Sequence, residues 1–339
     1  MSFTIIGENV HTTRVIRRRD RRVGSNEQGR EAIAFVDEHG AERWLPVSPA
    51  EQATMEYGEG RIKHVRTAVR LAMEEGEDAE VAVAYLRALA QHQVAAGAAF
   101  LDVNVDEVSL KLPEQKEAMA WLVGLLSPVV AVPLSVDSSN LEIIEAGLAA
   151  ADQHAGPPML NSASLERLEA LELAAATGGA VVITAAGSAG MPSGSQERVD
   201  YASQMVGHAE ARGIEHDRLF IDPLVFPISV DGTFGHHCLD AIREIRSRWP
   251  AAHITGGMSN VSFGLPNRRL INDAFLVMAI EAGADSGIID PILNPPARAL
   301  AGDRSAHPLQ LATDVLTGAD RNCKAFLRAS RAGELEVAA

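Results

Sequence analysis

The sequence predicts an α/β protein with a parallel sheet covered by helices, built from enough strand–helix units to form a (β/α)8 barrel. Short apolar runs alternate with longer segments in which apolar residues recur at helical spacing. The runs are nearly continuously apolar, which is typical of strands covered by helices on both faces. A doubly wound open sheet would more often show fewer strands, so the eight runs found here favour a barrel.

Each predicted strand ends in small or polar residues, and a helical pattern follows it. The eight strands begin at Thr4, Ala99, Val132, Pro158, Ala180, Leu219, His253 and Ser286. Several of the intervening helical patterns end in glycine, which is favoured just past a helix. After the last strand, HPLQLATDVLTGADRNCKAFLRASR predicts one final helix that closes the barrel.

One long segment, residues 14–66 approximately, does not fit this alternation. It opens with the basic run RVIRRRDRR and contains EAIAFVDEHGAERWLPV, which predicts a hairpin around His-Gly. We interpret it as an insertion in the first strand–helix connection, on the face of the barrel where active sites lie. The arginine run is typical of a solvated face or local salt bridges; the alternative is a lid or a docking surface for an anionic partner. Residues 1–339 are then one barrel domain.

Composition excludes several classes of function. The formal net charge is -15, which argues against nucleic acid as the main partner because phosphate binding needs clustered positive charge. No apolar run approaches the roughly 20 residues needed to cross a membrane. The N-terminus lacks a charged region followed by a long apolar one, and Cys238 and Cys323 give no disulfide framework. We expect a cytoplasmic protein.

Carboxylates and amides recur at the carboxyl ends of nearly all predicted strands. They are Glu8, Asn9, Asp102, Asn104, Asp137, Asn161, Asp222, Asn260 and Asp290. Any one of them alone could cap a loop, the commoner role of Asp or Asn after a strand. Because a barrel collects the carboxyl ends of its strands on one face, their recurrence predicts a single polar pocket.

A flat heteroaromatic ligand with an amide-like edge, such as a pterin, suits this set of residues. Its amino group and ring N–H are donors in one plane, and carboxylates such as Asp137 and Asp222 accept such a pair well. The Asn161 amide can both donate and accept. Two glycines before Asn260 would let the ring approach the backbone closely, with Asn260 facing its far side.

Six segments carry a resemblance to a known family. They are IIGENVHTTR, LDVNVDE, LSVDSSNLEIIEAGL, MLNSAS, IDPLVFPIS and GGMSNVSFGLPNRRLIN. The last is the most specific, because its pattern GxSNxSxGxPxRxxxN is long and chemically uneven. The chain resembles the pterin-binding methyltransferases, TIM barrels that move a methyl group between 5-methyltetrahydrofolate and a corrinoid. This family includes the folate module of cobalamin-dependent methionine synthase.

The resemblance implies roles for residues that contact the pterin. Asp137 of LSVDSSN is implied to bind the amino-pyrimidine edge, together with Asn161 of LNSAS and Asp222 of IDPL. Asp102 and Asn104 of LDVNV are expected to support the floor of the pocket. These five residues form the implied binding set on the early and middle strands.

The resemblance also implies a catalytic residue. Asn260 of GMSN is implied to hydrogen-bond N5 of the folate, the atom that carries the methyl group, and Gly257 and Ser259 line the same loop. An uncharged amide can change its hydrogen-bond polarity as N5 gains or loses a proton, so we expect no acid in direct contact with N5. Positioning and electrostatics would supply most of the catalysis.

Cofactors and partners follow from the same resemblance. Tetrahydrofolate or 5-methyltetrahydrofolate is the implied substrate, and cobalamin or a related corrinoid is the methyl acceptor or donor. The sequence lacks an Asp-x-His-x-x-Gly corrinoid-binding signature, so a separate corrinoid protein is expected to present it. The family also implies a homodimer. Transfer from methylcorrinoid to tetrahydrofolate, within a demethylation route, is one possible direction.

No metal site is expected. The adjacent His236 and His237 of GHHC project differently from a helix start and do not suit one ion. His11 and His64 have no evident partner and are interpreted as structural. Two alternatives to the methyltransferase stay open: a dihydropteroate synthase, whose lysine-bearing loop is not evident in IDPLVFPIS, and a non-catalytic folate-binding barrel.

Overall fold

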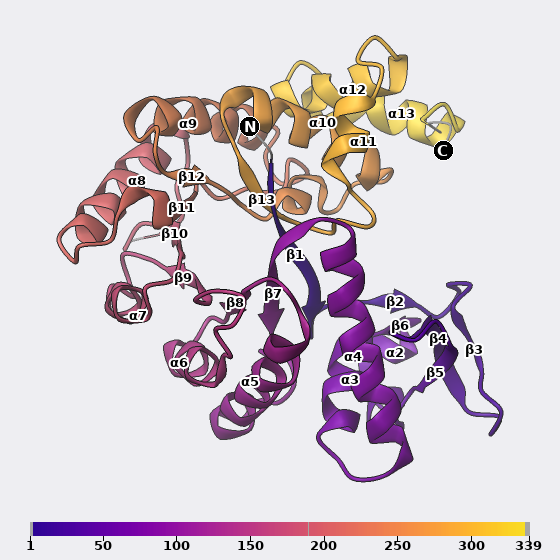
Figure 1. The fold of residues 1–339 in the computed structure, drawn as a ribbon. Helices are drawn as coiled ribbons and strands as arrows, with labels where there is room; N and C mark the ends of the chain where they lie inside the picture. Colours follow the sequence, from indigo (N-terminus) through magenta and orange to yellow (C-terminus); the bar gives the residue numbers. More distant parts are fainter. Residues whose placement is uncertain (1–2, 189, 336–339) are drawn as a thin grey trace. The chain divides into compact units, whose positions relative to one another are not determined.

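The computed structural model describes residues 3–188 and 190–335, and it contains all eight predicted strands (Figure 1). They form one sheet in the order β12-β11-β10-β9-β8-β7-β1-β13. Their bounds are β1 Thr4–His11, β7 Ala98–Asn104, β8 Leu134–Asp137, β9 Met159–Ala163, β10 Val181–Thr184, β11 Leu219–Asp222, β12 His253–Ile254 and β13 Ser286–Ile289. A parallel bridge between Gly257 and Ile288 joins the segment after β12 to β13, so the strand order is circular. The predicted (β/α)8 barrel fold is confirmed.

The chain divides into two compact units: one is Gly7–Asn161 and the other is the remainder. Helices of the first unit are α3 His64–Ala72, α4 Glu77–Ala95, α5 Leu112–Leu126 and α6 Leu141–Ala150. In its core, β7 and β8 pair in parallel so that Leu101 lies beside Leu134 and Val103 beside Val136, all four buried. The same register sets Asn104 level with Asp137, and Asp137 level with Asn161 of β9. The polar strand ends of this unit are therefore aligned by its apolar core.

The predicted hairpin lies in the connection between β1 and α3. Here β3 Val23–Ser25, β4 Glu31–Val36 and β5 Glu42–Pro46 form an antiparallel sheet, and β2 Ile16–Arg17 pairs with β6 Arg61–Ile62. The β4–β5 hairpin is confirmed. Its turn is held by Asp37, whose Oδ1 accepts the backbone N–H groups of His39 and Ala41. Two short helices, α1 Pro49–Gln52 and α2 Met55–Gly58, complete the segment.

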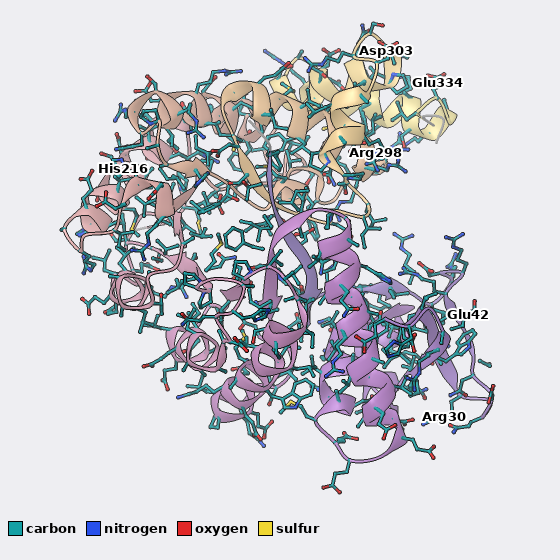
Figure 2. The ribbon with its side chains drawn as sticks, in the orientation of Figure 1. Arg30, Glu42, His216, Arg298, Asp303 and Glu334 are labelled. Atoms are coloured by element: carbon teal, nitrogen blue, oxygen red, sulfur yellow. The ribbon has the colours of Figure 1, made fainter. Side chains whose placement is uncertain are left out.

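A buried ion pair fixes the end of this segment to α3. Arg66 donates two hydrogen bonds to Oε2 of Glu51, at 2.7 and 3.0 Å, and both side chains are almost fully buried. Arg18 pairs with Glu31 and Arg22 with Asp20, so the local salt-bridge interpretation of the arginine run is confirmed for these two residues. Exposed charges of both units, such as Arg30, Glu42 and Asp303, lie on their outer surfaces (Figure 2).

Helices of the other unit are α7 Glu169–Thr177, α8 Ser195–Glu210, α9 Phe234–Arg248, α10 Arg268–Ala282, α11 Pro296–Ala301, α12 His307–Thr317 and α13 Lys324–Ala332. The prediction of a single closing helix is wrong. The helix α12 ends before Gly318, and Asn322 and Cys323 have φ values of 56° and 54°, which break the helical path. Asp320 then accepts the backbone N–H groups of Ala325 and Phe326 and so caps α13. None of the described helices could span a membrane.

Gly235 is expected to be essential for the packing of α9 against α12. A Cβ atom at this position would lie 2.3 Å from the backbone oxygen of Leu316, which cannot move as a flexible side chain could. We expect Gly235→Ala to destabilise the protein by about 1–3 kcal/mol, measured by urea denaturation. Gly207→Ala in α8 is the control because its Cβ meets no atom within 4 Å; a gain of about 0.5–1 kcal/mol is expected there. Equal stability of the two variants would contradict this account.

Candidate functional site

Four of the predicted site residues meet at the strand ends of the Gly7–Asn161 unit. Asn104 Nδ2 donates to Asp137 Oδ2 at 2.8 Å. Asn161 Nδ2 donates to Asp102 Oδ1 at 3.2 Å, and Ser135 Oγ donates to the same oxygen at 2.5 Å. Asp102 is 1% exposed, so its carboxylate is an internal acceptor that fixes the neighbouring side chains. Ligand atoms of Asp102 and Asp137 lie within 4.8 Å of one another, so the structure brings the two hydrogen-bonded pairs, Asn104–Asp137 and Asn161–Asp102, into one cluster.

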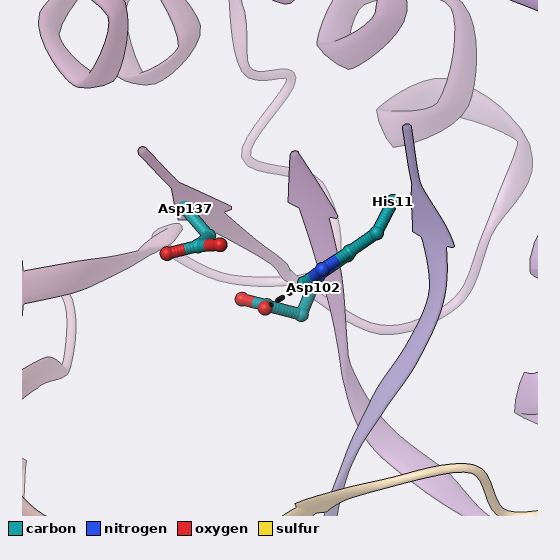
Figure 3. Close-up of side chains that lie close together, drawn as sticks. All are labelled: His11, Asp102 and Asp137. Atoms are coloured by element: carbon teal, nitrogen blue, oxygen red, sulfur yellow. Dashed lines mark hydrogen bonds and ion pairs between the residues drawn. The ribbon is translucent and has the colours of Figure 1, made fainter. Parts of the chain in front are cut away.

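His11 belongs to this cluster, and the expectation that it has no partner is wrong. As the last residue of β1, it contacts Asp102 from the side opposite Asp137, with 2.8 Å between Nε2 and Asp102 Oδ2 (Figure 3). Burial disfavours the charged imidazole, but the hydrogen bond to Asp102 and the nearby carboxylates raise the pKa of His11 above its usual value. The signal in the sequence was its position, at the same end of a strand as the predicted carboxylates.

His11, Asp102 and Asp137 are also the described residues that could hold a metal ion. One ligand atom from each lies within 4.8 Å of the others. However, Asp102 and Asp137 already accept hydrogen bonds from Ser135, Asn161 and Asn104, which occupy several of their lone pairs. The geometry is that of a hydrogen-bonded acid–base cluster.

Asp137 is the titratable centre of this cluster. Burial, with the negative charge of Asp102 as the second cause, raises the pKa of Asp137 to about 7. The hydrogen bond from Asn104 and the charge of His11 act in the opposite direction. Near neutral pH this side chain can therefore accept hydrogen bonds as a carboxylate or hold a proton.

The second group of predicted residues lies in the other unit, after β11 and β12. Asp222 ends β11, and burial raises the pKa of its carboxyl to about 6. Gly256 approaches it closely: its φ is 154°, and a Cβ there would lie 3.0 Å from Asp222 Oδ1. At Gly257 a Cβ would lie 2.8 Å from Asn260 Nδ2. The two glycines thus leave space for the polar atoms of Asp222 and Asn260.

Asn260 lies in the 3-10 turn Met258–Ser262 and is exposed. Its backbone N–H donates to Gly257 O at 3.0 Å, whereas its side-chain amide makes no hydrogen bond with any residue that the structure describes. The neighbouring Ser259 is held through its backbone: its carbonyl oxygen accepts a hydrogen bond from Arg268 Nη2 at 2.8 Å. Arg268, the arginine of GxPxR, was not assigned a role from the sequence.

Two further predictions have simple outcomes. Asp290 caps its own loop, because its Oδ1 accepts the backbone N–H groups of Ile292 and Leu293. His64 is buried and bonded to the hydroxyl of Tyr85, and burial lowers its pKa to about 3. His64 therefore has the structural role expected of it, although it has a partner.

Residues 73–290 match the family described as pterin binding enzyme. The chain belongs to this family. The pterin-binding enzyme is 30% identical over 276 residues to the methylcorrinoid:tetrahydrofolate methyltransferase of Eubacterium limosum, covering 79% of this chain and 93% of that one. It is 32% identical over 216 residues to methionine synthase of Mycobacterium leprae, covering 59% of this chain but 17% of the longer protein.

Solved structures agree with this assignment at the level of the fold. Dihydropteroate synthase from Yersinia pestis superposes with a TM-score of 0.51 at 21% identity. The match covers 62% of this chain and 83% of the synthase. The synthase from Xanthomonas albilineans, solved with 7,8-dihydropteroate, gives 0.50 at 21% identity, over 67% and 85%. At this identity the likeness concerns the barrel and leaves the reaction to be argued from the residues.

Proposed function

We propose that this pterin-binding enzyme is a methyltransferase of the EC 2.1.1 type, which moves a methyl group between N5 of 5-methyltetrahydrofolate and the cobalt of a corrinoid. The observation that carries the proposal is the exposed Asn260 amide, which has no internal partner in the described structure and stands beside two glycines. The Eubacterium limosum relative, matched over 93% of its length, supports the same reaction and the direction from methylcorrinoid to tetrahydrofolate.

In this proposal Asp137, Asn161 and Asp222 bind the pterin edge through hydrogen bonds. One oxygen of Asp137 is held by Asn104, so the carboxylate has a fixed orientation and a second oxygen for a ligand donor. Asn161 gives its N–H to Asp102, which leaves its carbonyl oxygen as an acceptor. Preorganised acceptors of this kind bind a planar pair of donors without reorganisation during the reaction.

Asn260 is proposed to contact N5 of the folate. A methyl group leaves a tertiary amine readily only if the departing nitrogen is protonated or its developing lone pair is stabilised, and in the reverse direction the lone pair must be aimed at the methyl group. The amide of Asn260 can donate or accept as required without a charge of its own. The corrinoid supplies a strongly nucleophilic cobalt centre when it is presented to the site.

A partner protein is proposed to carry the corrinoid, and the insertion to contribute to its docking surface. Arg17, Arg19 and Arg21 are exposed and make no ion pair within the described residues, in contrast to the neighbouring Arg18 and Arg22. Together these three arginines add local positive charge to an otherwise acidic chain. The homodimer, the cytoplasmic location and the single domain of residues 1–339 are parts of the same proposal.

Reversing the charge of Arg17, Arg19 and Arg21 to Glu is expected to slow methyl transfer with the protein-bound corrinoid by about tenfold or more at low salt, because electrostatic steering raises association rates. Transfer with free cobalamin should change less than about twofold. The control reverses Arg321, Arg328 and Arg331, which are also exposed and unpaired within the described residues. Equal losses with both forms of the corrinoid would assign Arg17, Arg19 and Arg21 to folding instead.

One assay tests the proposed reaction directly. Purified protein is mixed with methylcobalamin and tetrahydrofolate, and the absorption bands that report the oxidation state of cobalt are followed. Loss of methylcobalamin with formation of 5-methyltetrahydrofolate is the expected result. Binding of tetrahydrofolate without turnover would favour the non-catalytic barrel, and formation of a dihydropteroate from p-aminobenzoate would favour the synthase.

A further inference from the structure

The loop that follows Asp222 has a strained backbone. Leu224 has a φ of 67°, a left-handed conformation that costs a side chain other than glycine or asparagine roughly 1–2 kcal/mol. Its backbone N–H donates to Asp222 Oδ1 at 2.7 Å. Because the strained residue binds the carboxylate directly, whatever holds Leu224 in this conformation also orients Asp222.

The group that holds the other side of Leu224 is Arg198 of α8. Its Nη2 donates to the carbonyl oxygen of Leu224 at 3.4 Å, and its Nη1 donates to Gly194 O at 2.9 Å. The guanidinium also lies over the ring of Phe226, 4.9 Å from the centroid. Leu224 is therefore bound through its N–H by Asp222 and through its carbonyl by Arg198.

Arg198 is unusual for a structural arginine. Its side chain is 0% exposed, it forms no ion pair with a carboxylate of the described residues, and its Nε has no hydrogen-bond partner there. A buried cation without a bonded anion is costly, and such residues are normally paired. Its forked donors are directed at two backbone carbonyls instead of a carboxylate, which calls for a functional explanation.

We propose that Arg198 is a positioning residue that holds the Asp222–Phe226 loop in its strained conformation and thereby aims the Asp222 carboxylate at the pterin. The inference rests on the proposed function, in which Asp222 reads the pterin edge. It adds a buried residue of α8, far from the motif IDPL in the sequence, that decides the geometry and the charge of that contact.

Arg198 also acts on the ionisation of Asp222. Burial raises the pKa of Asp222, while the hydrogen bond from Leu224 and the charge of Arg198 lower it. Cys238 of α9 is a third titratable group here, and the charges of Arg198 and Asp222 both act on it; burial raises the pKa of its thiol to about 12, so it is neutral at physiological pH. His237, also on α9, has a lowered pKa through burial and through the charges of His236 and Arg198. Removing the guanidinium should therefore shift the ionisation of Asp222 to higher pH.

The test measures tetrahydrofolate binding by calorimetry from pH 5 to pH 8, without corrinoid or turnover. Arg198→Met should weaken binding at least tenfold at pH 7 and move one midpoint of the pH dependence upward, whereas Arg198→Lys should keep the wild-type midpoint. Adding Leu224→Gly to Arg198→Met should recover affinity at pH 8, because glycine adopts the loop conformation freely, but should leave the midpoint displaced. If Arg198→Met does not fold, Arg198→Gln replaces it with the same expected shift.

The matched control is Arg218→Met. Arg218 also binds backbone carbonyls, those of Ala174 and Gly179, but has no contact with the Asp222 loop. It should change stability without moving the midpoint. Wild-type affinity and midpoint in Arg198→Met, or the same behaviour as Arg218→Met, would overturn the inference alone. Failure of the wild-type protein to bind tetrahydrofolate would overturn the proposed function, and the role of Arg198 with it.

Discussion

Asn260→Ala is expected to lower the rate constant for methyl transfer by about 10²–10³, the usual loss when one preorganised hydrogen-bonding group is removed from a transition state. Binding of 5-methyltetrahydrofolate should weaken less than about tenfold. The reason for the difference is that the charge on N5 changes during transfer, so the contact from Asn260 strengthens on the way to the transition state. Single-turnover kinetics with methylcobalamin would measure the rate, and calorimetry the affinity.

A control from the same loop separates chemistry from loop folding. Asn267 is exposed and has a φ of 50°, which glycine adopts without strain, so Asn267→Gly should preserve the turn and leave the transfer rate unchanged. The substitution removes one hydrogen bond, which Asn267 Oδ1 accepts from Ser330 Oγ at 2.6 Å. Parallel losses of rate and affinity in Asn260→Ala would remove Asn260 from the chemical step.

The grouping of polar residues at the strand ends could be predicted, because it follows from the apolar pattern of the strands and from the topology of a parallel sheet. Apolar runs predict buried parallel strands, and parallel register places Asn104, Asp137 and Asn161 side by side whatever the loops do. The same reasoning predicted the hairpin at β4 and β5, since a turn signal lies between two alternating runs. These features depend on local sequence and on rules common to all barrels of this kind.

What the sequence did not predict depends on contacts between distant residues. The pairing of His11 with Asp102 joins positions 91 residues apart, and the role of Arg198 appears only when Leu224 is found at positive φ. The break between α12 and α13 was missed because Asn322 and Cys323 adopt left-handed conformations within an otherwise helical pattern. Side-chain capping by Asp320 decides that break, and apolar periodicity carries no information about it.

Asp137→Asn is expected to weaken tetrahydrofolate binding by about 1.5–3 kcal/mol, roughly 10–150-fold, the usual worth of a hydrogen bond to a charged group. The variant keeps an oxygen that can accept from Asn104 Nδ2 but presents an N–H to a pterin donor. Asp231→Asn is the control, because Asp231 is exposed and, among the described residues, its side chain bonds within its own turn, to Thr233. Unchanged affinity in Asp137→Asn would mean that the pterin edge is read by other residues.

The pH dependence gives the same prediction a second, independent signature. Burial raises the pKa of Asp137 to about 7, whereas an aspartate in the unfolded chain titrates near about 3.9. Between these values the native protein holds the extra proton, so the stabilising contribution of this group is complete below about pH 4 and is lost as the pH rises through about 7. Ligand binding needs the carboxylate and should strengthen over the same range.

Asp137→Asn should therefore bind tetrahydrofolate weakly at every pH. It should also unfold at a higher temperature than the wild type at pH 8 and at a similar temperature at pH 4. A binding residue that destabilises the empty protein explains both effects, whereas a structural aspartate would lose stability on the same substitution.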